Sequence, residues 1–157
     1  MTNYNYIKGY WLPTTTSAAH EEWFAYSYYI AEFWSTLSCI GFFMVSYIGL
    51  VYGNQNNTNI YYAVALCGFA SALSHITVKR SMLWFDYFGV LYNGLAMLMN
   101  MGAVVDACYK TNILYATLFT VFMGVYDVFN KYYAVNRYSL VHSVWHLSVA
   151  FTISYFI

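Results

Sequence analysis

The chain has 157 residues, of which 61% are hydrophobic, 23% aromatic and only 8% charged. About 25% of the residues of a soluble domain are charged, so this composition cannot cover a water-facing surface and predicts an integral, multi-pass membrane protein. Its six basic and six acidic residues give no net charge and form no basic cluster, which argues against nucleic acid as a partner.

Five hydrophobic runs, each about as long as a bilayer core requires, follow a polar N-terminal segment. Polar or charged residues separate the runs, and neither an internal repeat nor a second domain is visible. We therefore expect a single all-α domain over residues 1–157, a polytopic transmembrane helix bundle of about five spans. The polar segment covers 1–22, and the expected spans are 24–52, 60–78, 82–105, 113–133 and 139–157.

Three histidines lie inside these runs, where an ionisable side chain is costly and marks a candidate functional site. His142 and His146 are four residues apart, so a helix directs both imidazoles to one side. If the chain crosses the membrane five times, His75 lies near the same membrane face as this pair. It is then about one helical turn from the polar loop that follows it. Three neutral imidazoles at one depth predict a catalytic zinc centre with one open position.

Two more polar residues are expected to face this centre. Ser71 lies four residues before His75 on the same helical face, and Asp86 enters the membrane from the same basic turn. A cation held by three imidazoles can activate a water for attack on an amide or ester carbonyl. Asp86 would then hold that water and take its proton, and Ser71 would donate a hydrogen bond to the developing oxyanion. Glu32, near the start of the first span, comes out at the same depth.

Other interpretations of these residues remain open. A single histidine within a membrane is often a packing residue that is bonded to a neighbouring backbone or hydroxyl group. His75 and one of the terminal pair could instead be the axial ligands of a haem in an electron carrier. The chain could also be a zinc-containing lipid receptor or membrane-remodelling protein without catalysis, or a homologue that merely folds. Asp127, buried in the fourth run, is interpreted as a helix–helix hydrogen-bond partner and is given no role in the site.

Four segments of the chain resemble, in order, the signature blocks of the CREST superfamily. They are AEFWSTLS (31–38), GFASALSHIT (68–77), FDYFG (85–89) and HSVWH (142–146). This superfamily includes the alkaline ceramidases, the progestin and adipoQ receptors, and the relatives of myomaker and of GPI-processing phospholipases. The resemblance implies that His75, His142 and His146 are zinc ligands and that Ser71 and Asp86 complete the site.

The segment HEEWFAYSYYIAEFW (20–34) also resembles the N-terminus of the alkaline ceramidases, where acidic residues bind calcium. Glu21 and Glu32 fall on matching positions, so they are candidates either for a calcium site or for supporting a zinc ligand. The positions that match the family's other Asp and Asn ligands hold Ala18 and Trp23, which argues against calcium. FDYFG and HSVWH look closer to the myomaker and phospholipase branch.

The chain departs from the family in size. Asp86 and His142 are 56 residues apart in the sequence, which leaves room after the third span for one further helix, not the three of the seven-helix family. Compared with the seven-helix family, a chain with two fewer helices still has all its metal ligands near one membrane face. It lacks part of the wall of the lipid-binding cavity. We expect a minimal member or a chain that completes its cavity as a homo-oligomer, acting as a zinc-dependent hydrolase on an amide or ester bond of a membrane lipid.

Overall fold

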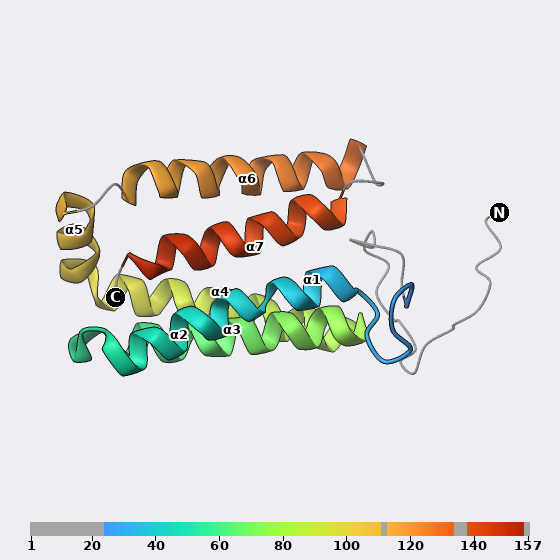
Figure 1. The fold of residues 1–157 in the computed structure, drawn as a ribbon, viewed down its shortest axis with the longest axis horizontal. Helices are drawn as coiled ribbons and strands as arrows, with labels where there is room; N and C mark the ends of the chain where they lie inside the picture. Colours follow the sequence, from blue (N-terminus) through green and yellow to red (C-terminus); the bar gives the residue numbers. More distant parts are fainter. Residues whose placement is uncertain (1–23, 111–112, 134–137, 156–157) are drawn as a thin grey trace.

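The computed structural model describes residues 24–110, 113–133 and 138–155. Within these ranges the chain forms helices and no strand (Figure 1), so the prediction of an all-α helical bundle is confirmed. The elements are α1 (Phe33–Ser38), α2 (Ile40–Tyr52), the short 3-10 helix η1 (Gln55–Asn57), α3 (Thr58–Thr77), α4 (Arg80–Met99), α5 (Met101–Lys110), α6 (Ile113–Tyr133) and α7 (Tyr138–Ser154).

Helices α1 and α2 form one apolar rod that is interrupted only at Cys39. The sequence predicts that this span begins at residue 24, whereas the helix begins at Phe33. The backbone just before it is bonded to the end of α3 instead. The N–H groups of Ala31 and Glu32 donate to two carbonyls in the last turn of α3, each at 3.0 Å. These bonds satisfy helix-end carbonyls that have no partner within α3, and they prevent α1 from starting earlier.

The third expected span, 82–105, corresponds to two helices. Helix α4 ends at Met99, and α5 continues after a bend of 77°. The break lies at Asn100, whose side-chain amide donates to the carbonyl of Ala96 at 2.7 Å, while its backbone N–H donates to Met97 at 3.1 Å. In a regular helix the backbone N–H of Asn100 would donate to the carbonyl of Ala96. The Asn100 side chain occupies that acceptor instead, and the helix ends here without proline or glycine.

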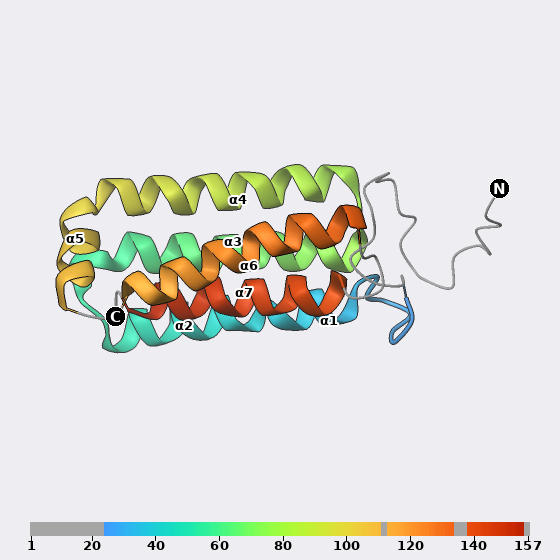
Figure 2. The same ribbon diagram turned by 90° about the horizontal axis from the view of Figure 1, so that it is seen from above.

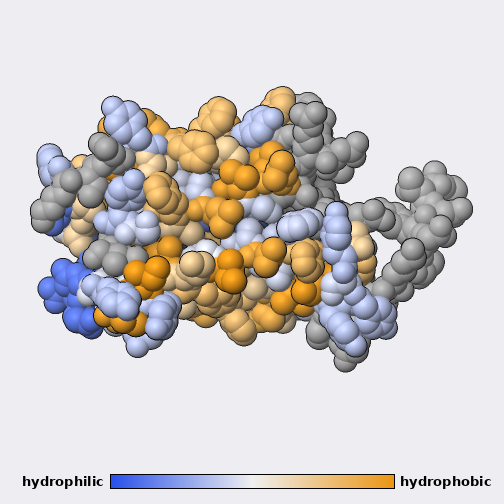
Figure 3. Space-filling view, viewed as in Figure 1, coloured by the Kyte–Doolittle hydropathy of each residue, from blue (hydrophilic) through white to orange (hydrophobic). Residues whose placement is uncertain are grey.

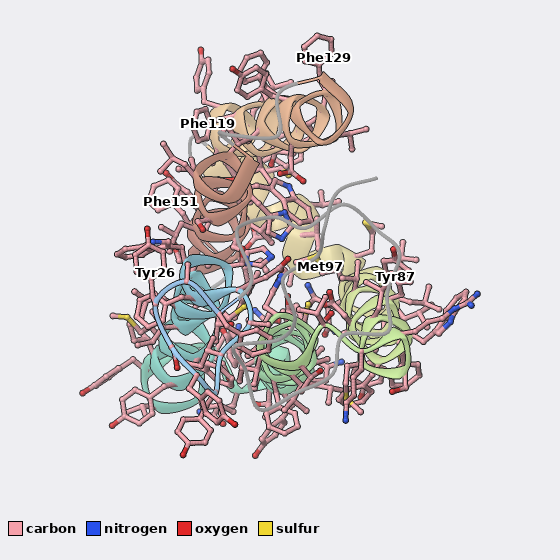
Figure 4. All side chains as sticks on the ribbon, turned by 90° about the vertical axis from the view of Figure 1, so that its right-hand side faces the viewer. Tyr26, Tyr87, Met97, Phe119, Phe129 and Phe151 are labelled. Carbon is pink, nitrogen blue, oxygen red and sulfur yellow. The ribbon has the colours of Figure 1, made fainter. Side chains whose placement is uncertain are left out.

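The helices form an angle rather than a closed ring. Figure 2 shows α4 along one edge and α1–α2 along the opposite edge, with α3 between them. Helix α7 packs on α1 and α2, and α6 packs on α7. In the end view of Figure 4, α7 and α6 rise from the layer of α1 to α4, so the interior corner lies between α3, α4 and α7.

The apolar core joins α2, α3 and α7, with contributions from α5 and the start of α6. Gly68 lets α3 approach α2 closely, since a Cβ built on it would lie 2.6 Å from Cβ of Phe42. Gly89 brings α4 against α3 in the same way, because its added Cβ would lie 3.1 Å from Cα of Cys67. Small residues at such crossings are typical of helices that pack in a membrane.

Among the described residues, two helices are long and apolar enough to cross a membrane, Phe33–Tyr52 and Gln55–Thr77. The bent pair of α4 and α5 would be a third span, and α6 and α7 contain shorter apolar stretches, Ile113–Phe129 and Leu140–Ser154. Large hydrophobic side chains such as Phe119, Phe129 and Phe151 cover the outer surface (Figures 3 and 4). A surface of this kind is that of a membrane protein, and five crossings remain a prediction.

Candidate metal centre

The three histidines predicted as ligands lie together at one end of the bundle. His75 is in the last turn of α3, and His142 and His146 are in the first half of α7. Figure 1 shows that α3 ends and α7 begins at the same end of the molecule, where α1 and α4 also begin. All three imidazoles are buried, and their candidate ligand atoms lie within 4.8 Å of one another.

Glu32 fixes the ring of His75. The backbone N–H of Glu32 donates to the carbonyl of His75 at 3.0 Å, which holds the two residues side by side. The Glu32 carboxylate then lies 2.6 Å, through Oε2, from Nδ1 of the same histidine. A carboxylate only accepts hydrogen bonds, so a neutral His75 carries its proton on Nδ1 and leaves the lone pair of Nε2 facing the centre.

Asp127 on α6 has the same relation to His142. Its Oδ2 lies 3.1 Å from Nδ1 of His142, and both side chains are buried. The interpretation of Asp127 as a helix–helix hydrogen-bond partner is therefore correct, but the partner is a candidate ligand. The sequence signal was present, since an acidic side chain inside an apolar run is costly enough to need a specific contact.

Ser38 at the end of α1 holds His146. Its hydroxyl donates to the carbonyl of Ser35 at 2.7 Å and lies 2.9 Å from Nδ1 of His146. Because the single hydroxyl proton is already used, Ser38 accepts from Nδ1–H, and the lone pair of the third Nε2 also faces inward. Nothing in the sequence pattern distinguished Ser38 from the other small residues of the first span.

The site therefore fits a metal on the chemistry of its donors. Nε2 of His75 lies 3.3 Å from Nε2 of His142. Two nitrogens bound to one tetrahedral zinc, each at 2.0–2.1 Å, lie about 3.3 Å apart. Lone pairs that face each other at this distance need a proton or a cation between them. The three Nδ1 partners also match the hydrogen bonds that orient metal-binding histidines in other proteins.

Ser71 lies one turn before His75 on α3, and Asp86 lies near the start of α4; their part in the site remains a prediction. Ser71 is buried on α3, and the Asp86 side chain in the second turn of α4 is near enough to it for an electrostatic interaction. Asp86 is near enough to His75 for their charges to interact. Asp86 is not among the three residues whose candidate ligand atoms cluster. Glu21 lies outside the described residues.

A groove reaches the same end of the bundle between α1 and α7. It has a volume of about 490 Å³ and is lined almost entirely by apolar side chains, including Leu37, Leu140 and Leu147. Ser38, which holds His146, also lines it. A groove of this size is within the range of small-molecule sites and can take part of a lipid chain.

Comparison with known proteins agrees with the motifs. No family model matches the chain, and no solved structure matches it. Alkaline ceramidase 3 of Mus musculus is 29% identical to it over 154 residues, which is 93% of this chain and 56% of the relative. The chain thus spans little more than half the length of this relative. It is a partial homologue of alkaline ceramidase 3, and this similarity supports at most a place in the ceramidase-type superfamily.

Proposed function

We propose that the chain is a zinc-dependent hydrolase that cleaves an amide or ester bond of a membrane lipid. The observation that carries the proposal is the orientation of the three imidazoles. Each Nδ1 is bonded to an acceptor on another part of the chain, so all three Nε2 atoms are available to one metal. The similarity to an enzyme whose name is alkaline ceramidase supports a lipid substrate, with a ceramide-like amide or an acyl ester as its scissile bond.

When bound, zinc would supply Lewis-acid activation of a water and of a carbonyl oxygen. The chain's own residues would do the rest. Asp86 would orient the attacking water and accept its proton, since it is near enough to His75 for their charges to interact. The Ser71 hydroxyl, which lies near Asp86, would donate to the carbonyl oxygen as negative charge develops there.

The hydrophobic part of the substrate needs an apolar channel next to these groups. The groove between α1 and α7 is one such place, because Ser38 belongs both to its wall and to the support of His146. Five membrane crossings would place the imidazoles at one face of the bilayer.

The haem alternative fits the geometry less well. A bis-histidine haem needs two imidazoles on opposite faces of a flat macrocycle. Here Nε2 of His75 and Nε2 of His142 lie 3.3 Å apart, and a nitrogen of His146 lies within 4.8 Å of both. Three converging rings leave no slot for a macrocycle between any two of them. A zinc-containing lipid receptor would have the same metal site as the proposed hydrolase. The two functions differ only in whether the bound lipid is cleaved.

The test is hydrolysis of labelled lipids by the purified chain in mixed vesicles. The panel should contain ceramides of several chain lengths and acyl-ester lipids, and His146→Ala should serve as the variant without a complete ligand set. We expect one lipid class to be cleaved by the wild type and not by His146→Ala. Zinc-loaded protein that leaves every amide and ester lipid intact would contradict the hydrolase and favour the receptor.

A further inference from the structure

Asp127 is a costly residue in an otherwise lipid-facing helix. Every other residue of 121–129 in α6 is exposed or half-buried, whereas Asp127 is 7% exposed. An acidic side chain in an apolar helix needs a compensating interaction, or the helix loses stability in the membrane. Its contact with His142 is such an interaction, and the question is whether it serves packing or the metal centre.

Contacts other than that of Asp127 also hold α6 on α7. Thr120 donates to the carbonyl of Ser148 at 3.0 Å and lies 2.8 Å from the hydroxyl of Thr152. Ile113 and Ala116 are buried further along the same face. These contacts already attach the helix at neutral positions, where a charged group would not be needed. A carboxylate in the seam therefore calls for another explanation.

The charge of a bound metal ion explains why a carboxylate lies at position 127. Three neutral imidazoles around a divalent cation leave two positive charges in a buried place, which is unfavourable unless counter-charges lie close by. Glu32 and Asp127 are both one hydrogen bond from a ligand imidazole, and each supplies one negative charge. Both carboxylates help to offset the charge of the cation, as Asp86 near His75 also would, and each selects the ring tautomer that directs Nε2 inward.

We propose that Asp127 is a positioning residue of the metal centre, which orients His142 for metal binding and, with Glu32, helps to offset the charge of the cation. The proposal rests on the proposed zinc site. It assigns α6 a part in metal binding, although no side chain of α6 is itself a ligand in the group of three. Loss of Asp127 should weaken metal binding without removing a ligand.

The experiment compares zinc affinity, measured by competition with a chromophoric chelator, for four proteins in detergent. They are the wild type, Asp127→Ala, Asp127→Asn and Thr120→Val. We expect Asp127→Ala to bind zinc about 10- to 100-fold more weakly, as found for other partners of ligand histidines. Asp127→Asn should lose less, because an amide oxygen still accepts from Nδ1–H. Thr120→Val removes a bond of the same α6–α7 seam and should keep the wild-type affinity.

A second measurement does not require metal. Nitrogen NMR of histidine-labelled, metal-free protein should show Nδ1 of His142 protonated, with the signal identified by its loss in His142→Gln, and only partly protonated in Asp127→Ala. Unchanged protonation of Nδ1 would overturn the proposal. Wild-type affinity in Asp127→Ala, or an equal loss in Thr120→Val, would also overturn it and leave the proposed function standing. A wild-type chain that binds no zinc would overturn both.

Discussion

Replacement of Glu32 by alanine should weaken metal binding although Glu32 is not a ligand. The carboxylate lies 2.6 Å from Nδ1 of His75, and the two residues are 2% and 4% exposed. Without it, the buried N–H of His75 loses its acceptor, which costs about 1–3 kcal/mol. Loss of a hydrogen-bond partner of a metal-binding histidine lowers affinity about 10- to 100-fold. That range corresponds to about 1.4–2.8 kcal/mol of binding free energy.

Zinc affinity is again measured by chelator competition, with two control variants. Glu32→Gln keeps an oxygen that can accept from His75 and should lose less affinity than Glu32→Ala. Thr36→Val removes a hydroxyl that donates to the Glu32 carbonyl at 2.7 Å but leaves the carboxylate in place, so it should bind zinc as the wild type does. The backbone bond from Glu32 to His75 persists in all three variants because it involves no side chain.

Equal zinc affinity of Glu32→Ala and Thr36→Val would refute this reasoning. It would show that the short contact between Glu32 and His75 does not affect how His75 binds the metal. A response to calcium would instead assign Glu32 to a calcium site. If calcium stimulates the wild type and Glu32→Ala abolishes the stimulation, Glu32 belongs to a calcium site, as the ceramidase-like N-terminal segment allows. We expect calcium to leave zinc affinity unchanged, because the carboxylate is already committed to His75.

Three further changes separate chemistry, packing and substrate binding. Asp86→Asn should keep zinc but lower kcat for lipid hydrolysis about 100-fold or more, since it removes the proposed base; a fall in zinc content instead would make Asp86 a ligand. Gly68→Ala should destabilise the bundle by about 1–3 kcal/mol in thermal unfolding, because its Cβ would lie 2.6 Å from that of Phe42, whereas Gly94→Ala meets open space and should not lower the melting temperature. Leu147→Trp would fill part of the groove between α1 and α7 and should raise KM for long-chain lipids but not for a short-chain ester; equal effects on both would exclude the groove as a chain site.

The helices and the meeting of the histidines follow from local features of the sequence. Long apolar runs predicted the helices, and the bounds of α6 agree with the expected 113–133. Counting spans placed His75 and the terminal pair at one end, where the structure also brings them. His142 and His146 are four residues apart, so a single helix is enough to place both on one side. These inferences depend on periodicity and length, which a single sequence contains.

The support of the imidazoles could not be predicted in the same way. Glu32 reaches His75 because the backbone before α1 bonds to the end of α3, a contact between residues 43 positions apart. Ser38 and His146 are 108 positions apart. The bend after α4 depends on the side chain of Asn100, which competes with the helix for one carbonyl. Such partners are set by tertiary packing, so residue type and spacing alone do not identify them.

The central claim is that three histidines hold one zinc ion, and the metal content of the purified chain tests it most directly. Wild type, His142→Ala and Asp86→Ala should be purified without added metal and analysed by elemental mass spectrometry. The account predicts about one zinc per chain in the wild type, most of it lost in His142→Ala and largely kept in Asp86→Ala. Zinc that is absent from the wild type, or unchanged in His142→Ala, would contradict the ligand assignment.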